Sequence, residues 1–251
     1  MIHLFTDFGL EGPYIGQVKA VLHRSCPGVP VIDLCADAPA FDPRAAAYLL
    51  AAYDSGCEAG DVVVAVVDPG VGGARATIVL EVDGRWYVGP DNGIFEAVLA
   101  QAAGPCRCWE IIWRPAAVSP SFHGRDIFAP IAAAIAGGKT PDKAPDGWFR
   151  AAKVTRKDWP ADLAEVVYVD HFGNLVTGLR AASLQSDSGL SVNGRPVSRA
   201  KTFSDVSPRG CFCYENANGL MEIAVNQERA DQHFSLDIGA KIEVSMADCG
   251  F

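Results

Sequence analysis

The residues in this sequence best suited to catalysis are Asp68, Arg75 and His123. Asp68 follows Val62–Val67, a mostly β-branched apolar run that is typical of a strand buried on both faces of a parallel sheet. Pro69 ends that strand, and three of the next four residues are glycines, which permit a tight turn returning Arg75 toward the carboxylate. His123 lies in a later loop, and an imidazole with a pKa near neutrality is suited to accept a proton. The three side chains form an acid–base cluster if the fold brings them together.

Three further loops carry carboxylates or glycines, namely Thr6–Gly9, Pro90–Gly93 and Phe122–Asp126. We expect all four loops along the carboxyl edge of one sheet, where ligands bind in open α/β folds. The glycine-rich loop has neither the G-x-G-x-x-G spacing nor a P-loop lysine, so no nucleotide phosphate site is predicted. Ordinary alternatives remain for single residues, because Asp7 can cap a helix and Asp91 and Asn92 are common in turns.

The first 150 residues alternate strands with helices, which is the pattern of a largely parallel, doubly wound sheet. Asp42-Pro43 is a typical helix start, and Asp83-Gly84 is a typical hairpin turn. Apolar spacing predicts helices at Tyr14–Arg24, Arg44–Tyr53, Ile94–Ala103 and Asp126–Ala136. Strands are predicted at Ile2–Thr6, Val31–Leu34, Val62–Val67, Thr77–Val82, Trp86–Val88 and Ile111–Trp113.

The rest of the chain has a different pattern. Prolines, glycines and basic residues lead into an expected linker at 151–162, between a domain of residues 1–150 and a second domain of residues 163–251. Asn193-Gly194 predicts a hairpin there. Six short strands are predicted, at Val166–Val169, Leu190–Val192, Pro196–Val197, Cys211–Tyr214, Met221–Val225 and Lys241–Val244. This pattern favours a small antiparallel β-barrel.

Composition argues against several classes of partner. The 251 residues carry a formal net charge of −9, whereas binding of nucleic acid requires clustered Lys and Arg. The N-terminal stretch lacks a basic segment and is interrupted by Asp7, so it does not resemble a signal peptide. No apolar run approaches the roughly 18 residues that span a bilayer. We therefore expect a cytoplasmic protein without a nucleic-acid or membrane partner.

The eight cysteines do not form a recognisable zinc motif. None belongs to a C-x-x-C pair, and the two-armed Cys/His spacing of structural zinc sites is missing. We expect reduced thiols and no metal site. The cysteines are Cys26, Cys35, Cys57, Cys106, Cys108, Cys211, Cys213 and Cys249.

Several motifs together resemble the S-adenosyl-L-methionine hydroxide adenosyltransferase family, also called DUF62 and related to the fluorinating and chlorinating enzymes. They are TDFG followed by Tyr14-Ile15-Gly16, then VVDPGVGGAR, PDNG, FHGRDIFAP and DHFGNLVT, in family order from Ile2 to about Val244. The resemblance implies an α/β fold with an N-terminal Rossmann-like three-layer domain and a C-terminal small antiparallel β-barrel. It also implies a homotrimer, with substrate between the N-domain of one subunit and the C-domain of its neighbour.

The resemblance further implies hydrolysis of S-adenosyl-L-methionine to adenosine and L-methionine, without a metal or cofactor. Asp68, Arg75 and His123 correspond to the family's catalytic Asp-Arg-His triad. In this interpretation His123 accepts a proton from water, Arg75 polarises the nucleophile and Asp68 orients both. The sulfonium makes methionine a leaving group that needs no protonation, so activation and in-line placement of water dominate the barrier.

Substrate-binding residues are likewise implied by the resemblance. In the first domain, Asp7 would bind the ribose hydroxyls, and Phe8 and Phe41 would line the pocket. In the second domain, Asp170 would meet the methionine ammonium. The residues expected around adenine are Phe172, Asn174, Phe203, Asn216, Asn218 and Asn226. This chain has Gly12, beside Glu11, where the family usually has an Asp near the methionine end.

Two alternatives to hydrolysis stay open. A halide-using relative would form 5′-chloro- or 5′-fluoro-5′-deoxyadenosine, although the halogenating relatives lack the Asp-Arg-His triad. A non-catalytic module would bind S-adenosylmethionine or adenosine without turnover. For Phe41, Phe172 and Phe203, ordinary core packing is the alternative to a binding role.

Overall fold

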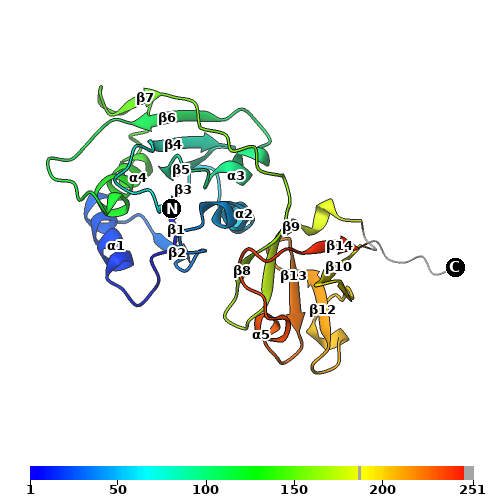
Figure 1. Ribbon diagram of the computed structural model, residues 1–251. Coiled ribbons are helices and arrows are strands. Elements are labelled where there is room, and N and C mark those ends of the chain that lie inside the picture. The colour runs from blue at the N-terminus through cyan, green and yellow to red at the C-terminus, as the bar shows by residue number, and fades with distance from the viewer. Residues whose placement is uncertain (186–187, 246–251) are drawn as a thin grey trace. The chain divides into compact units, whose positions relative to one another are not determined.

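The computed structural model describes residues 1–185 and 188–245 (Figure 1). The chain forms two compact units, Met1–Trp159 and Pro160–Phe251. Each unit has its own buried hydrophobic cluster. Cys249 and the other residues after Ser245 in the expected second domain lie outside the described residues.

A seven-stranded mixed sheet forms the centre of the first unit, in the order β2-β1-β3-β5-β4-β6-β7. The pairs β2-β1, β1-β3 and β3-β5 are parallel, and the remaining three are antiparallel. The strands are β1 (Ile2–Thr6), β2 (Val31–Cys35), β3 (Val62–Val66), β4 (Thr77–Val82), β5 (Arg85–Pro90), β6 (Arg107–Ile111) and β7 (Phe149–Ala151).

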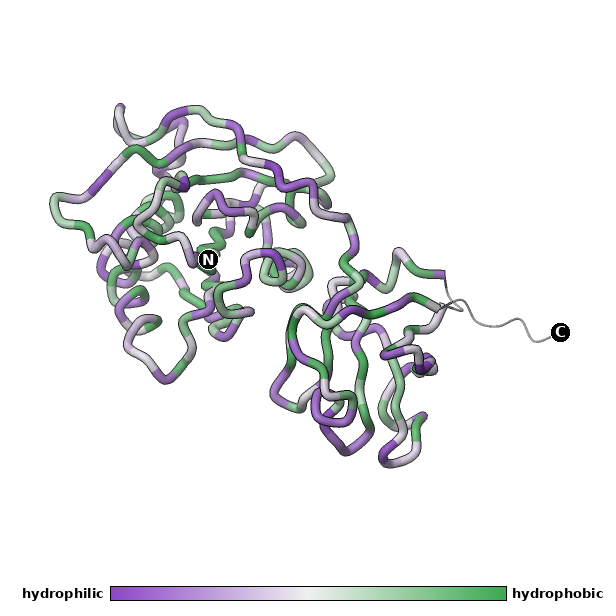
Figure 2. The backbone as a smooth tube through the Cα atoms, in the orientation of Figure 1, coloured by the Kyte–Doolittle hydropathy of each residue, from purple (hydrophilic) through white to green (hydrophobic). Residues whose placement is uncertain are grey.

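Helices cover both faces of this sheet (Figure 1). On one face, α1 (Tyr14–Ser25) and α4 (Ala129–Ala136) pack over alternate residues of β1 and β3, forming a buried hydrophobic cluster. On the other face lie α2 (Pro43–Tyr53) and α3 (Glu96–Ala100). The strands at the centre are hydrophobic along most of their length (Figure 2). β3 is buried at all five positions, as a strand covered on both faces should be.

Most predicted elements of the first unit are present. Asp42 caps α2, since its carboxylate accepts the N–H groups of Arg44 and Ala45 at 3.0 Å. Asp83-Gly84 forms the β4–β5 turn, with both residues at positive φ. α3 is shorter than the predicted helix at both ends. It begins two residues later because the Asn92 side chain accepts the N–H of Ile94 and holds a turn there. β6 begins four residues before the predicted strand, in antiparallel register with β4, and β7 was missed.

The segment that follows β7 is attached to the first unit. The Asp91 carboxylate accepts the N–H and hydroxyl of Thr155, the latter at 2.7 Å. The buried Glu96 accepts from Arg156 at 2.9 Å and from the N–H of Lys157 at 3.1 Å. These contacts bring most of the expected linker into the first unit, which ends at Trp159.

The second unit contains two antiparallel sheets and one short helix, α5 (Ala230–Phe234). One sheet has the order β12-β13-β9-β8, and the other β11-β10-β14. Isolated bridges join Glu165 to Lys241 and Arg199 to Cys213. The strands are β8 (Leu163–Val169), β9 (Leu175–Arg180), β10 (Gly189–Val192), β11 (Arg195–Val197), β12 (Cys211–Glu215), β13 (Leu220–Val225) and β14 (Glu243–Ser245).

β9 was not predicted, and its glycine explains why. Gly178 interrupts the apolar pattern of this strand. A Cβ atom at Gly178 would lie 2.7 Å from the Cβ of Leu163 on β8, so the close approach of the two strands requires glycine here. Sequence alternation alone cannot reveal such a contact.

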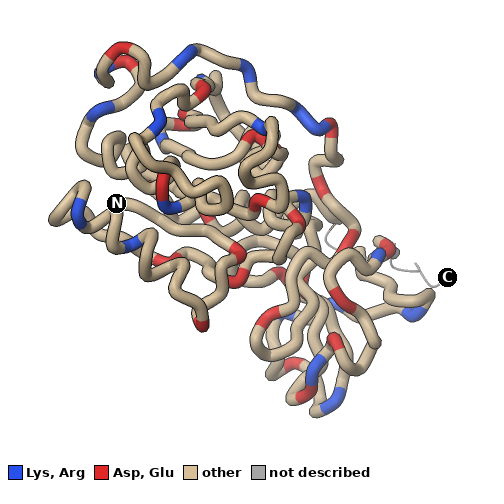
Figure 3. The backbone as a smooth tube through the Cα atoms, turned by 60° about the vertical axis from the view of Figure 1, so that its left-hand side comes forward, with Lys and Arg blue, Asp and Glu red and all other residues tan. Residues whose placement is uncertain are grey.

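No helix in the described part of the chain is long and apolar enough to cross a membrane. Lys and Arg residues are interspersed with Asp and Glu over both units (Figure 3).

Candidate active site

The candidate active site lies where loops following two adjacent parallel strands meet. Asp7 is the first residue after β1, and one residue separates Asp68 from the end of β3. The two strands pair in parallel up to Thr6 and Val66. A cavity of about 290 Å³ opens at this edge of the sheet. Its lining includes Asp7, Phe8, Phe41, Asp68, Phe122 and His123, all from the first unit.

Asp68, Arg75 and His123 are in direct contact, although 48 residues separate the last two. The Arg75 guanidinium pairs with the Asp68 carboxylate through two hydrogen bonds, Nε to Oδ1 at 3.0 Å and Nη2 to Oδ2. Nη2 also lies 2.9 Å from His123 Nδ1. The side chains of Asp68 and Arg75 are only 4% and 11% exposed, so their pairing is little screened by solvent.

Gly72 allows the two loops that carry these residues to pack together. A Cβ at Gly72 would lie 2.6 Å from the carbonyl oxygen of Pro120, and the residue has a φ of +77°. Both the contact and the backbone conformation therefore demand glycine. The close approach places the turn before Arg75 directly against the loop that leads to His123.

His123 immediately precedes an irregular helical turn. Residues Gly124–Phe128 form a π-helical turn that continues into α4, a feature often found at functional sites. Sequence periodicity had indicated only a regular helix from Asp126. Asp126 accepts the N–H of Ser119 at 2.8 Å, which closes the loop around His123.

The hydrogen bond from Arg75 determines which nitrogen of His123 carries the proton. A guanidinium can only donate, so Nδ1 must accept, and the neutral ring then has its hydrogen on Nε2. Burial, reinforced by the positive charge of Arg75, lowers the pKa of His123. The neutral imidazole therefore presents an N–H at Nε2 instead of a basic lone pair.

Asp7 and Phe41 are joined at the mouth of the cavity. The Phe41 N–H donates to Asp7 Oδ2 at 3.2 Å, and the Phe41 side chain is 78% exposed, which argues against core packing. Burial raises the pKa of Asp7, and the charge of Asp68 acts in the same direction. Phe8 contacts the Phe122 ring edge-on and the Tyr14 ring at a tilt, and so supports the cavity wall.

The PDNG motif supports the catalytic loop from behind. Asn92 Nδ2 donates to the carbonyl of Val67 at 2.8 Å, in the peptide that leads into Asp68. Its Oδ1 accepts the N–H of Ile94 at 3.2 Å. Sequence reasoning marked this motif but did not assign it this positioning contact.

In the second unit, Asp170 and Asn174 form one compact loop between β8 and β9. The Asp170 carboxylate accepts the Asn174 N–H at 2.8 Å and its Nδ2 at 3.1 Å. Phe172, at the tip of the loop, is 72% exposed and so does not belong to the core of this unit.

Other predicted adenine contacts in this unit stabilise turns. Asn216 Oδ1 accepts the N–H groups of Asn218 and Leu220 at 3.0 and 3.1 Å. Asn226 Nδ2 donates to the carbonyls of Phe203 and Val206, at 3.1 and 2.6 Å. The Phe203 ring packs edge-on against two aromatic rings of β12. These contacts define the loop conformations around the expected binding residues.

Sequence reasoning missed Glu222, a carboxylate on β13 that is only 5% exposed. It accepts hydrogen bonds from Tyr214 and from Asn216 Nδ2. The only available signal was a lone acidic residue in an otherwise apolar strand.

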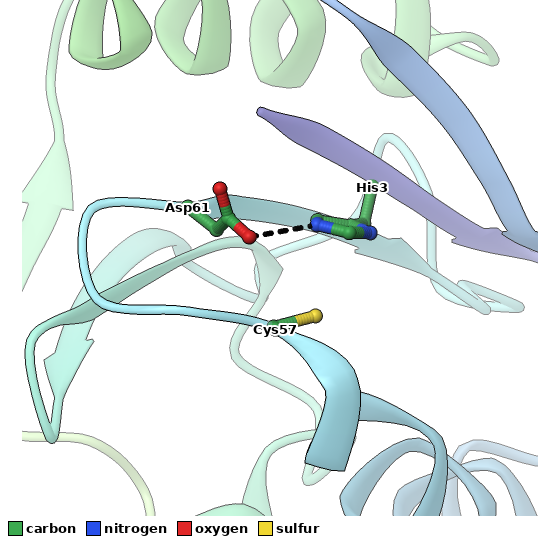
Figure 4. A group of neighbouring side chains, drawn as sticks. All are labelled: His3, Cys57 and Asp61. Atoms are coloured by element: carbon green, nitrogen blue, oxygen red, sulfur yellow. Dashed lines mark hydrogen bonds and ion pairs between the residues drawn. The ribbon is translucent and has the colours of Figure 1, made fainter.

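One group in the described part of the chain has metal-type ligand atoms close together: His3, Cys57 and Asp61, all within 4.8 Å (Figure 4). His3 Nε2 lies 3.0 Å from Asp61 Oδ2, and His3 Nδ1 is buried without a partner. A metal at Nε2 would leave a buried, unpaired N–H at Nδ1, whereas metal-bound histidines normally donate that hydrogen. Asp61 also accepts from the Met1 amino group and the Glu58 N–H. We interpret the group as an anchor between the beginnings of β1 and β3.

Comparison with known proteins identifies the family. The models of the SAM hydroxide adenosyltransferase N-terminal and C-terminal domains match residues 2–145 and 164–243. A Thermus thermophilus protein named (R)-S-adenosyl-L-methionine hydrolase is 38% identical, with 97% of this chain and 98% of the relative covered. The crystal structure of an uncharacterized conserved protein from Thermotoga maritima aligns with a TM-score of 0.82 and 32% identity, covering 97% and 99% of the two chains. A fluorinase from Nocardia brasiliensis is more distant, at 22% identity over 98% of this chain and 97% of the relative. This chain belongs to the SAM hydroxide adenosyltransferase family.

Proposed function

We propose that this protein hydrolyses S-adenosyl-L-methionine to adenosine and L-methionine. The hydrogen-bonded group of Asp68, Arg75 and His123 at the cavity is the observation that carries the proposal. The oxygen of water bonds to ribose C5′ while the C5′–S bond breaks. The electron pair of the broken bond stays on sulfur and neutralises the sulfonium. The proton lost by water passes to solvent. The reaction balances with water alone, so the proposal requires no cofactor.

Arg75 is the centre of nucleophile stabilisation in this mechanism. Asp68 binds the edge of the guanidinium formed by Nε and Nη2. Nη1 has no hydrogen bond to the described residues and is left for the attacking oxygen. A cation held by a buried carboxylate favours hydroxide over water at the reacting position. Asp68 contributes by holding the guanidinium in one orientation.

His123 acts in this mechanism as a hydrogen-bond donor. Its Nδ1 accepts from Arg75, so the Nε2–H is the group that orients the nucleophile. This role differs from the general base expected from sequence, which requires a lone pair at Nε2. Because the pKa of His123 is lowered, its ring stays neutral at pH values at which an ordinary histidine is already protonated. The contact with Arg75 is kept there as well.

Asp7, Phe8 and Phe41 form the substrate-binding part of the first unit in this proposal. Asp7 accepts the ribose hydroxyls, and the exposed Phe41 ring covers the sugar and sulfonium. Asp170 in the second unit binds the methionine ammonium. The residues assigned to adenine are Phe172, Asn174, Phe203, Asn216, Asn218 and Asn226.

We also propose the finer architecture that the family suggests: a Rossmann-like catalytic domain at 1–150 and a small β-barrel at 163–251. The connecting segment 151–162 lies mostly against the first of them. The two isolated bridges, which join β8 to the segment before β14 and β12 to the segment after β11, support a closed barrel. We further propose a cytoplasmic homotrimer with sites between subunits, in which the exposed rings of Phe41 and Phe172 would be covered. Light scattering should then give about three times the chain mass of 26.6 kDa.

Product analysis tests the function directly. Purified protein incubated with S-adenosylmethionine should release adenosine and methionine in equal amounts, and ¹⁸O from labelled water should enter the 5′-hydroxyl. Parallel incubations with chloride or fluoride test the halogenase alternative, which predicts a 5′-halo-5′-deoxyadenosine. Binding without turnover in calorimetry would instead identify a non-catalytic module, and either result would reject hydrolysis.

A further inference from the structure

The loop that carries Asp68 and Arg75 crosses the end of β5. The sheet order is β3-β5-β4, so the chain that joins β3 to β4 passes over the strand between them. β3 runs parallel to β5 and β4 runs antiparallel to it, which places the end of β3, the end of β5 and the start of β4 at one edge. The PDNG residues Pro90–Gly93 stand at this end of β5. They are therefore within reach of both ends of the catalytic loop, residues 68–75.

The two ends of the catalytic loop are attached in different ways. Where the loop enters β4, the Asp91 N–H donates to the Ala76 carbonyl at 3.0 Å, which extends the β4–β5 ladder by one bond. Where the loop leaves β3, Pro90 has no N–H with which to extend the β3–β5 ladder. The Asn92 side chain supplies a donor there instead, since its Nδ2 lies 2.8 Å from the Val67 carbonyl oxygen.

The Asn92 amide is itself held in one orientation. Its Oδ1 accepts the Ile94 N–H at 3.2 Å, so Nδ2 is the atom directed at Val67. Val67 is fully buried, and a buried carbonyl that loses its donor cannot turn to water without a cost in free energy. Asn92 thus fixes the peptide group that joins Val67 to Asp68.

The orientation of that peptide group sets the direction of the Asp68 carboxylate. Asp68 binds Arg75 at two points, through Nε and Nη2, and the Asp68 side chain is only 4% exposed. A two-point contact of this kind has a narrow geometry, so a small rotation of Asp68 breaks one of its bonds. Arg75 is also the residue that contacts His123. A change at Asn92 therefore reaches the catalytic group through Asp68.

The PDNG residues are also fixed by the segment that follows β7. Thr155 donates its N–H and its hydroxyl to the Asp91 carboxylate, the hydroxyl at 2.7 Å. A Cβ atom at Gly93 would lie 2.5 Å from the Trp159 ring, so this turn and the segment are in close contact. The Asn92 side chain consequently reaches the catalytic loop from a base that is held in place.

We propose that Asn92 is a positioning residue, which holds Asp68 in the orientation that binds Arg75 at two points. The proposal rests on the proposed function, in which Arg75 stabilises the attacking oxygen. It gives the PDNG motif a role in the rate of the reaction, beyond that of a turn, and no role in binding the substrate.

Asn92→Asp removes only the donor. The variant keeps the shape of the side chain and the acceptor for the Ile94 N–H, but it turns a carboxylate oxygen toward the Val67 carbonyl. Steady-state kinetics with S-adenosylmethionine should show kcat reduced about tenfold and KM changed by less than about twofold. Calorimetry with adenosine should give the same number of sites per chain as in the wild type, which excludes loss of folded protein as the cause. Thr155→Val, the matched control, removes a hydrogen bond to the neighbouring Asp91 and should leave kcat unchanged.

A double-mutant cycle separates positioning from general damage. If Asn92 acts through Asp68, its substitution has nothing to act on once that carboxylate is removed. Asn92→Asp should therefore lower kcat by less than about twofold when it is added to Asp68→Ala. A purely structural effect of Asn92 would instead lower kcat about tenfold in both backgrounds. If Asn92→Asp does not fold, Asn92→Ala removes the same donor without adding a charge, and the same pattern is expected.

Crystal structures of the wild type and of the Asn92 variant supply a readout that needs no turnover. In the variant the Val67 carbonyl should turn from its wild-type direction, and Asp68 should lose at least one of its two hydrogen bonds to Arg75. A variant that keeps both bonds, or a cycle in which the two effects add, overturns the role of Asn92 and leaves the proposed function standing. A wild-type protein that does not hydrolyse S-adenosylmethionine overturns the proposed function, and the two structures still decide whether Asn92 holds Asp68.

Discussion

Two of the polar centres in this molecule are built around opposite charges. In the first unit a buried cation, Arg75, is held by one carboxylate and also donates to a histidine. In the second unit a buried anion, Glu222, is held only by neutral donors. The first arrangement can stabilise a second anion that arrives with the reaction. The second holds the Tyr214 hydroxyl and the Asn216 amide in place. Of the two centres, only the first has a charge that suits the reaction proposed above.

Removing the cation should have the largest effect. Arg75→Ala should lower kcat by about 10³-fold, because the nucleophile loses its charged donor, while KM changes by less than about threefold. Steady-state kinetics with S-adenosylmethionine measures both. Arg209→Ala, which changes a surface arginine paired with Glu228, is the matched control and should leave kcat unchanged. A rise in KM at constant kcat would place Arg75 in binding and break the comparison.

The role of His123 gives the next largest effect. His123→Ala should lower kcat by about 10²-fold, whereas His123→Gln, whose amide N–H reaches about the position of Nε2, should recover most of that loss. Because the pKa of His123 is lowered, any loss of rate through its protonation should lie below pH 6.5. Above that, kcat should continue to rise as hydroxide becomes available. If kcat instead stays constant from pH 7 upward and His123→Gln is inactive, His123 acts as a general base.

Loop packing should have an intermediate effect. Gly72→Ala places a Cβ against the Pro120 carbonyl and should lower kcat about tenfold by moving Arg75 away from His123. Gly138→Ala is the matched control, since Gly138 also has a positive φ but no atom within 4 Å of the added Cβ. Both variants should lose about 1 kcal/mol of stability from backbone strain, and only Gly72→Ala should lose rate. Equal rates for the two would show that the contact does not position the site.

A substitution of Asp61 changes the opposite edge of the same sheet, and there we expect an effect on stability without an effect on kcat. Burial alone raises the pKa of Asp61, but hydrogen bonds from the Met1 amino group, the Glu58 N–H and His3 lower it to about 2. Because the pKa of Asp61 is lower in the folded than in the unfolded state, its ionised form stabilises the fold at pH values above 3.8. This stabilisation is lost as the pH falls from 3.8 toward 2. Asp61→Asn should therefore lower Tm by a few degrees at pH 7, with the difference shrinking between pH 4 and 2. A change in kcat would contradict the assignment as an anchor.

Much of the first unit was predictable because its signals are local. A long apolar run, an Asp-Pro helix start and an Asp-Gly turn each act over a few residues, and β3, α2 and the β4–β5 hairpin follow them. Elements that depend on distant partners were misplaced or missed. β9 requires a glycine facing Leu163, and the π-helical turn after His123 has no periodic pattern of its own.

The groups available for chemistry can be found in the order of residues alone: Asp68 at a strand end, Arg75 after a glycine-rich turn, and a histidine in a later loop. Only the tertiary structure decided their relation, because the contact between Gly72 and Pro120 joins loops almost fifty residues apart. It also decided protonation, since the Arg75 hydrogen bond makes His123 Nδ1 an acceptor. Residue types are local information, whereas hydrogen-bond direction depends on which partner the fold brings within reach.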